Sequence, residues 1–408
     1  MAPESMPAGA RDIYQEGLHF PPTRLVADGE IDEETESLLL ANVRNPDERR
    51  ADLRAQVAAN ERAEARVGDL LADHGDRLLA VFDAVVDYSR GCVESELADL
   101  PDGTYRASDA VKGDGVTDDI PVEVAVTVDG ATVEVDFAGT ADRVTGNVNA
   151  PLTVAKSAVY FVIRCITDPE IPPNHGCYEP VTVDAPEESL LNPDPPAAVV
   201  GGSVETSQRV TDVMFVALAD AAPERVPAGG QGTMNNVVMG DADFAYYETG
   251  GGGAGANPDG DGLSGVQVGT TNTLSTPVEV LEAAYPVRVE RYALREGSGG
   301  DGRFRDGDGL VRSLRVATDA TVSLLTERRR HPPRGIAGGD DGQVGSNRID
   351  GESVGAKVTR EADAGTTVTV ETPEGGGHGT PIDGGHGTPS SDGTGMAAES
   401  TDEDDPRE

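Results

Sequence analysis

The sequence has 408 residues, and its 73 acidic against 32 basic side chains give a formal net charge of −41. Hydrophobic residues make up 37% of the chain, as in a globular protein with real cores, so folding does not require disulfides or a structural metal. Halophilic proteins use such an acidic surface to stay hydrated in strong salt. The same charge repels nucleic acid and anionic lipid, so neither is an expected partner.

The N-terminal residues, the apolar segments and the cysteines indicate the cellular compartment of the protein. The first twenty residues lack a basic segment followed by an apolar run, and no later stretch approaches the length of a membrane span. We therefore expect a soluble, cytoplasmic protein. Cys92, Cys165 and Cys177 are spaced unlike a zinc site, and we expect buried thiols in a reducing compartment.

Residues 1–100 are predicted to form an antiparallel helical region. Asn45 before Pro46 indicates a helix start with a capping side chain, and apolar residues then recur at steps of three or four until a glycine ends the pattern. Asp76 is expected to cap a second long helix, and a shorter helix is expected over residues 32–43.

Residues 101–373 change to a pattern of period two and are predicted to form a mixed, mostly antiparallel β-sheet core with packed helices. Alternating valines on both sides of Asp129-Gly130 predict a β-hairpin. Helices are predicted over residues 151–166 and 204–221, and strands over 287–294, 309–316 and 321–325. The fold class is therefore α+β.

Two segments are predicted to lie outside this core. Residues 374–408 consist largely of Gly, Ser, Thr, Asp and Glu, which bury too little surface to become ordered, so a disordered acidic tail is expected. Residues 327–330 are interpreted as a strand end with a solvated or subunit-facing charge cluster.

The runs 229–236, 244–255 and 271–282 combine glycines with Asn, Gln, Thr, Tyr and Glu. Glycine lets the backbone approach a ligand closely, and its neighbours supply hydrogen-bond donors and acceptors at fixed places. Any one run alone is typical of turns between strands. Together, with few charges in so charged a chain, they predict a polar ligand pocket.

These runs resemble the hydantoinase B and oxoprolinase family, the larger subunit of ATP-dependent cyclic-amide hydrolases, to which the α subunit of acetone carboxylase is related. The resemblance extends over residues 10–17, 42–50, 52–56, 146–151, 174–177, 191–193, 201–209, 327–330 and 372–379. It implies a B-type subunit that directs water to a hydantoin-like or 5-oxoproline-like ring. A separate A-type subunit, with an actin-like fold, would bind ATP and Mg and activate the amide by phosphorylation.

The lysines agree with nucleotide binding on another chain, because none of Lys112, Lys156 and Lys357 directly follows a glycine as a P-loop requires. Hydrolysis of the activated ring needs a base for water and donors for the oxyanion. Glu248 is the first candidate for the catalytic carboxylate and Glu205 the second. The backbone N–H groups of residues 251–255 are the candidate oxyanion donors. Candidate substrate-binding residues are Asn147, Asn149, Gln208, Gln231, Asn235, Tyr247, Gly252, Gly253, Asn272 and Glu279.

Relatives in this family begin well before the segment that matches Ala10, and that earlier part carries a His and Asp motif expected to bind the catalytic metal. No cluster in this sequence replaces the motif, so the family metal site is expected to be absent here. A separate N-terminal fragment of the B-type chain is then an expected partner. Two alternatives stay open: a catalytically degenerate or split fragment that acts as a scaffold, and a carboxylase α-type subunit acting on a small ketone.

Overall fold

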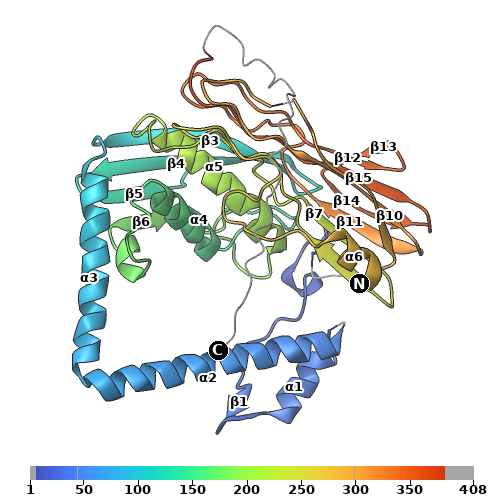
Figure 1. Cartoon of the computed structure of the whole chain (residues 1–408), viewed down its shortest axis with the longest axis horizontal. Helices are drawn as coiled ribbons and strands as arrows, with labels where there is room; N and C mark the ends of the chain where they lie inside the picture. The colour runs from blue at the N-terminus through green and yellow to red at the C-terminus, as the bar shows by residue number, and fades with distance from the viewer. Residues whose placement is uncertain (1–5, 44, 298, 382–408) are drawn as a thin grey trace, which may run out of the picture.

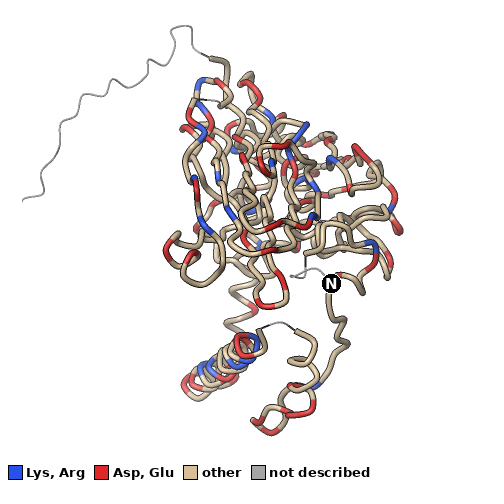
Figure 2. The backbone as a smooth tube through the Cα atoms, turned by 90° about the vertical axis from the view of Figure 1, so that its right-hand side faces the viewer, with Lys and Arg blue, Asp and Glu red and all other residues tan. Residues whose placement is uncertain are grey.

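The computed structural model describes residues 6–43, 45–297 and 299–381. It confirms the α+β class: helices and three larger sheets form the body, and a helical arm projects from it (Figure 1). Within the described ranges the strands pair antiparallel, except for one parallel pair in the first sheet. In Figure 2 the acidic positions are spread along the whole described chain and do not gather in one segment.

The arm consists of α1 (Glu33–Leu40), α2 (Pro46–His74) and α3 (Arg77–Ala98). The antiparallel packing predicted for the long helices is wrong, because α2 and α3 meet at an elbow and then diverge (Figure 1). The physical reason is that α3 is anchored elsewhere: its buried Ser89, Val93 and Leu97 pack against the body. Helix α2 has no buried residue, and its predicted apolar stripe is half-buried at Leu53 and Val57 and exposed at Val67 and Leu70.

The helix starts lie where the sequence predicts them, but the predicted caps do not form. Asn45 adopts a left-handed conformation with φ 53°, and its side chain makes no cap hydrogen bond. Its Nδ2 instead donates to the carboxylate of Glu48 at 3.4 Å. Asp76 makes no side-chain cap hydrogen bond either, because its own backbone is already helical. Pro46 lies in the first turn, as predicted.

The first sheet has the order β3 (Gly103–Gly113), β4 (Asp118–Asp129), β5 (Thr132–Asp136) and β6 (Val181–Asp184). The predicted hairpin is confirmed, with Asp129 opposite Thr132 across the turn. Helices α4 (Leu152–Cys165) and α5 (Ser207–Leu218) pack on one face of this sheet (Figure 1). A π-helical turn, η3 (Gly202–Thr206), leads directly into α5, where the sequence predicts one continuous helix.

Two further sheets pack together and enclose a second core. One has the order β14 (Lys357–Ala362), β11 (Ala320–Leu325), β7 (Asn236–Gly240) and β8 (Ala245–Glu248). The other has the order β13 (Glu352–Val354), β12 (Ser346–Ile349), β15 (Thr367–Glu371), β10 (Leu310–Val316) and β9 (Val287–Leu294). The strands predicted over residues 287–325 are therefore confirmed.

Smaller elements complete the fold: the hairpin β1 (Val26–Ala27) and β2 (Glu30–Ile31), helix α6 (Val278–Ala284) and the 3-10 turns η1 (Ile13–Gln15) and η2 (His175–Tyr178). Among the described residues the cysteines are free thiols; Cys177 is buried as predicted, whereas Cys165 is exposed. Within the described ranges, no helix combines the length and apolar character that crossing a bilayer requires.

The predicted disordered tail begins too early, because residues 374–381 lie in the body. Gly376 N donates to Gly229 O at 2.7 Å and Gly377 N donates to Asp340 O at 2.9 Å. A Cβ added at Gly376 would lie 2.2 Å from Arg334 O, so glycine permits this close backbone packing. Amino-acid composition did not predict this ordered segment, because backbone hydrogen bonds to distant residues hold it in place. The remainder of the predicted tail, residues 382–408, lies outside the described residues.

Asp306 and Glu374, both buried in this glycine-rich region, predict a pH effect on stability. Burial, and next the charge of Glu374, raise the pKa of Asp306 to about 7. Burial raises the pKa of Glu374 to about 7, against the lowering effect of Arg295. Both pKa values in the folded state lie above the unfolded values of about 4, so the folded state binds more protons than the unfolded state. The free energy of unfolding therefore falls as pH rises from about 4 through about 7.

We expect the double variant Asp306→Asn, Glu374→Gln to lose less Tm than the parent between about pH 5 and pH 8, since amides do not ionise. Thermal unfolding at fixed salt measures both slopes. The exposed Asp259→Asn is the control and should keep the parent slope. An unchanged slope in the double variant would refute the assignment.

Candidate substrate site

A hollow of about 400 Å³ opens between the end of β8 and the loop of residues 270–276. Most of the lining residues carry a hydroxyl or an amide group, and Glu248 is the one charged side chain in the lining. Such a hollow suits a small polar ligand of low charge. The lining residues are Met234, Tyr247, Glu248, Thr249, Thr270, Thr271, Asn272, Thr273, Leu274 and Thr276.

Glu248 is the last residue of strand β8, and it hydrogen-bonds to the loop on the opposite side of the hollow. Its Oε1 accepts a hydrogen bond from Thr276 N at 2.8 Å. Its Oε2 contacts both the guanidinium of Arg312 and the hydroxyl of Tyr246. Burial raises the pKa of Tyr246, so that hydroxyl stays protonated and donates. These contacts use both oxygens of Glu248, and they favour an orienting carboxylate over a free base at this position.

Glu205, the second catalytic candidate, is fully buried in η3 and does not line the hollow. Its Oε1 accepts from Met234 N at 3.2 Å and from Asn236 Nδ2 at 2.7 Å. Burial, and next the charge of Glu327, raise the pKa of Glu205 to about 8. Glu205 therefore lies behind the wall of this hollow and not in its lining.

Tyr247 and Asn272 are the predicted binding residues that, with Glu248, the structure brings to one hollow. Gln231 and Asn235 lie behind the wall and hold it. Asn235 Nδ2 donates to Gln231 Oε1 at 2.7 Å, and Gln231 Nε2 donates to Gly250 O at 3.2 Å. Gln208 also acts from behind, since its Nε2 donates to the hydroxyl of Thr270 at 3.2 Å.

The structure places Asn147, Asn149 and Glu279 away from this hollow. Asn149 uses its amide to fix the backbone, with its Nδ2 donating to Val144 O, Gly146 O and Ala198 O. Asn147 donates to Pro7 O at 2.9 Å. Glu279 is exposed on the first turn of α6. Asparagine side chains beside glycines also serve to hold turns, and residue type alone does not separate this use from ligand binding.

Gly252 and Gly253 are not the predicted oxyanion donors. Gly252 N donates to Val266 O at 2.9 Å and Gly253 N donates to Pro373 O at 3.1 Å, so neither N–H faces the hollow. A Cβ at Gly253 would lie 1.9 Å from Gly307 O, which explains the glycine through backbone packing.

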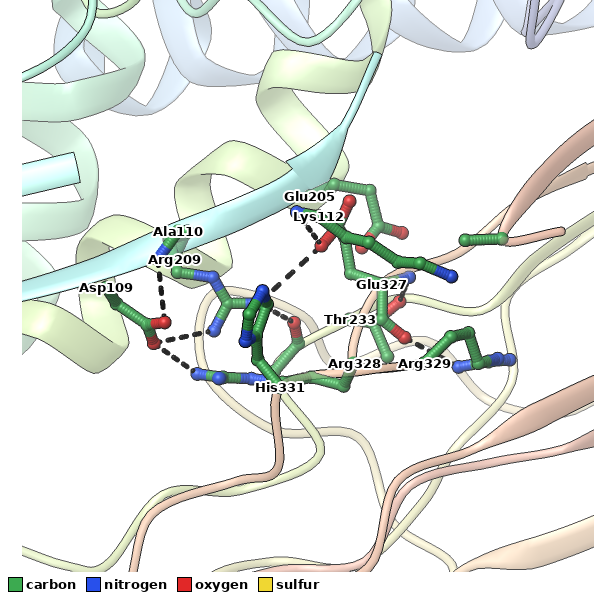
Figure 3. A network of polar contacts seen from close by, with 12 residues as sticks. Asp109, Ala110, Lys112, Glu205, Arg209, Thr233, Glu327, Arg328, Arg329 and His331 are labelled. Atoms are coloured by element: carbon green, nitrogen blue, oxygen red, sulfur yellow. Dashed lines mark hydrogen bonds and ion pairs between the residues drawn. The ribbon is translucent and has the colours of Figure 1, made fainter. Parts of the chain in front are cut away.

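A buried ionic network that the sequence did not predict joins β3, α5 and the segment after β11 (Figure 3). Arg209 Nη1 contacts Asp109 at 3.1 Å and Asp212 at 2.9 Å. Arg328 contacts the same two carboxylates, Asp109 at 2.9 Å. The signal available in the sequence was Arg209 with Asp212, about one turn apart in the predicted helix over residues 204–221.

The prediction of a solvated cluster over residues 327–330 is wrong for its first two members, since Glu327 and Arg328 are 1% and 2% exposed. Glu327 binds Lys357 Nζ at 2.7 Å and accepts from Lys112 N at 2.8 Å. These partners lie far away in the sequence, so local composition could not reveal them. Arg330 is exposed, as predicted.

Residues 6–43, 45–297 and 299–381 were compared with the side-chain groupings that bind metal ions in proteins. No three His, Cys, Asp or Glu side chains there are grouped so as to hold a metal ion.

Comparison with known proteins identifies the protein family. The family model "Hydantoinase B/oxoprolinase" matches residues 1–381. An uncharacterised protein of Methanocaldococcus jannaschii is 36% identical over 93% of this chain and 68% of its own length. The putative B-type subunit of a D-/L-hydantoinase from a Pseudomonas strain is 30% identical over 91% of this chain and 66% of its own. The chain belongs to the hydantoinase B/oxoprolinase family.

Other relatives are much longer than this chain. 5-Oxoprolinase 1 of Arabidopsis thaliana is 36% identical over 93% of this chain, which spans 32% of that protein. Among solved structures, the ATP-dependent caprolactamase of Pseudomonas jessenii superposes with a TM-score of 0.84 at 28% identity, over 93% of this chain and 69% of that one. Nucleotide-free acetone carboxylase shares the fold, with a TM-score of 0.80 at 18% identity over 94% of this chain and 59% of that one.

We expect Arg328→Met to lower the free energy of unfolding by about 3–5 kcal/mol, because Asp109 and Asp212 would keep buried charge with one cation fewer. Denaturant unfolding at fixed salt measures the loss. Arg330→Met, at an exposed neighbouring site, is the control and should cost about 1 kcal/mol or less. Equal losses in the two variants would contradict a structural role for the network.

Proposed function

We propose that the chain is a B-type subunit of an ATP-dependent cyclic-amide hydrolase that opens the C–N bond of a hydantoin-like or 5-oxoproline-like ring. The observation that carries the proposal is the hollow that brings Tyr247, Glu248 and Asn272 together within a wall of threonine hydroxyls. Such a wall offers donors and acceptors to an amide without a buried charge of its own beyond Glu248. The names of the relatives, which include 5-oxoprolinases and a hydantoinase, support this ligand class.

In this proposal an A-type partner binds ATP and Mg and activates the ring amide, because the chain has no P-loop lysine. The name of the similar ATP-dependent caprolactamase supports the use of ATP. This chain then holds the activated ring and admits water.

Glu248 has a specific part in this scheme. Arg312 and Tyr246 hold its carboxylate in place, and Thr276 N connects it to the loop that forms the opposite wall. A fixed negative group at the wall orients a water molecule by accepting its hydrogen bond, and it keeps both walls at the correct separation. Hydroxyls of the threonines supply donors to the ring oxygen.

The direct test is reconstitution in high salt, which the net charge of −41 favours. The chain is co-expressed with the A-type partner, and ring opening of 5-oxoproline and of hydantoin is measured with and without ATP. We expect turnover only when all parts and ATP are present. Turnover by the isolated chain without ATP would refute the division of labour, and a complete but inactive assembly would favour the scaffold alternative.

We expect Glu248→Gln to lower kcat/KM of the assembly at least about tenfold, a loss of about 1.4 kcal/mol of transition-state stabilisation. The reason is that the amide removes the charge that orients water and pairs with Arg312. Steady-state kinetics at matched folded concentration measure the change. Glu296→Gln, at an exposed site outside the hollow, is the control, and an equal rate for both variants would remove Glu248 from the site.

A further inference from the structure

The edge strand β9 carries apolar side chains that the second core leaves uncovered. Leu294 lies opposite Leu310 and Tyr292 lies opposite Arg312 across β9 and β10. Residues directly opposite each other in a sheet share one face, and Tyr292, Leu310 and Arg312 line one small cavity on that face. Leu310 is buried, whereas Tyr292 is 42% and Leu294 41% exposed. The face that β10 buries is therefore open to solvent at β9.

This uncovered surface is continuous with the mouth of the hollow. The Tyr292 hydroxyl donates to Ser275 Oγ at 3.1 Å, and Ser275 belongs to the loop of residues 270–276. Leu274, in the same loop, lines the hollow and is 90% exposed. The Arg312 guanidinium, which pairs with Glu248, lies 5.2 Å from the centre of the Tyr292 ring. We call Leu274, Tyr292 and Leu294 the apolar rim.

The chain around the rim is depleted of charge. Residues 262–278 contain no Asp, Glu, Lys, Arg or His, although charged residues make up 26% of the whole sequence. None of these residues is buried, so the segment forms surface and not core. Loss of charge together with an exposed tyrosine is typical of the centre of a protein–protein interface. The composition therefore indicates that another protein, and not water, covers this surface.

The position of the rim indicates which partner covers it. In the proposed function, the A-type partner activates the ring amide, and water destroys such an activated group unless the site excludes it. The partner must then release the activated ring close to the mouth of the hollow. A second copy of this chain docked on the rim would obstruct that mouth, so the location favours the A-type partner as the occupant.

We propose that the apolar rim is the surface on which the ATP-binding A-type partner docks, with Tyr292 as its central anchor. The inference rests on the proposed function and assigns the contact surface of its partner. Docking there covers the uncovered face of β9 and closes the hollow against bulk water. Tyr292 suits an anchor because its large ring is half-exposed and is held from behind by Arg312.

The test measures the Kd between the purified chain and the purified A-type subunit by titration calorimetry at fixed salt, without substrate. We expect Tyr292→Ala to raise Kd about tenfold or more, because the anchor is lost. Tyr292→Phe should stay close to the parent, since the ring is retained. The double variant Leu274→Ser, Leu294→Ser should also raise Kd about tenfold, because two apolar side chains no longer become buried on binding.

Leu79→Ser is the matched control, because Leu79 is an exposed leucine on α3, at the opposite end of the molecule from β10 (Figure 1), and its Kd should equal that of the parent. Equal Tm values show that each variant is folded. An unchanged Kd in both rim variants, in an assembly that opens the ring, would overturn the inference and leave the proposed function standing. If the rim variants lose binding but the parent assembly opens no ring, the docking surface stands and the proposed function fails. If the parent does not bind the A-type subunit, both fail.

Discussion

Four buried charged side chains join the parts of this protein that the site requires. Asp109 comes from β3 of the first sheet, Arg209 and Asp212 come from α5, and Arg328 follows β11 in the second core. Each cation contacts both carboxylates, so the charges compensate one another inside the body. Because the partners come from distant segments, the network also fixes how the first sheet and its helices face the remaining sheets (Figure 3).

The wall of the hollow depends on this junction through short connections. Glu327, next to Arg328, donates its backbone N–H to the hydroxyl of Thr233 at 3.0 Å. Asn235 N donates to the same hydroxyl at 3.1 Å. Hydrogen bonds to Thr233 therefore position residues 233–236 next to the network. Within this segment, Asn236 accepts a hydrogen bond from the Tyr247 hydroxyl. The hydrogen-bonded residues Thr233 and Asn235 are not part of the wall of the hollow, whereas the wall carries threonine hydroxyls that can rotate to donate or accept.

The sequence predicted those features that local chemistry decides. Alternating valines around Asp129-Gly130 determine the hairpin, and Pro46 determines where α2 begins. The glycine-containing runs supply most of the lining of the hollow, including Tyr247, Glu248 and Asn272. What could not be predicted were tertiary partners: the Glu327–Lys357 pair and the carbonyls that take up the N–H groups of Gly252 and Gly253. The same limit explains why residues 374–381 looked like a tail.

The most direct test of the central claim is a crystal structure of the chain with 5-oxoproline bound. The account predicts the ring in the hollow of about 400 Å³, in contact with Tyr247 and Asn272 and with Glu248 still bound to Arg312. A ring bound at another place on the body, with no ligand between β8 and residues 270–276, would contradict it.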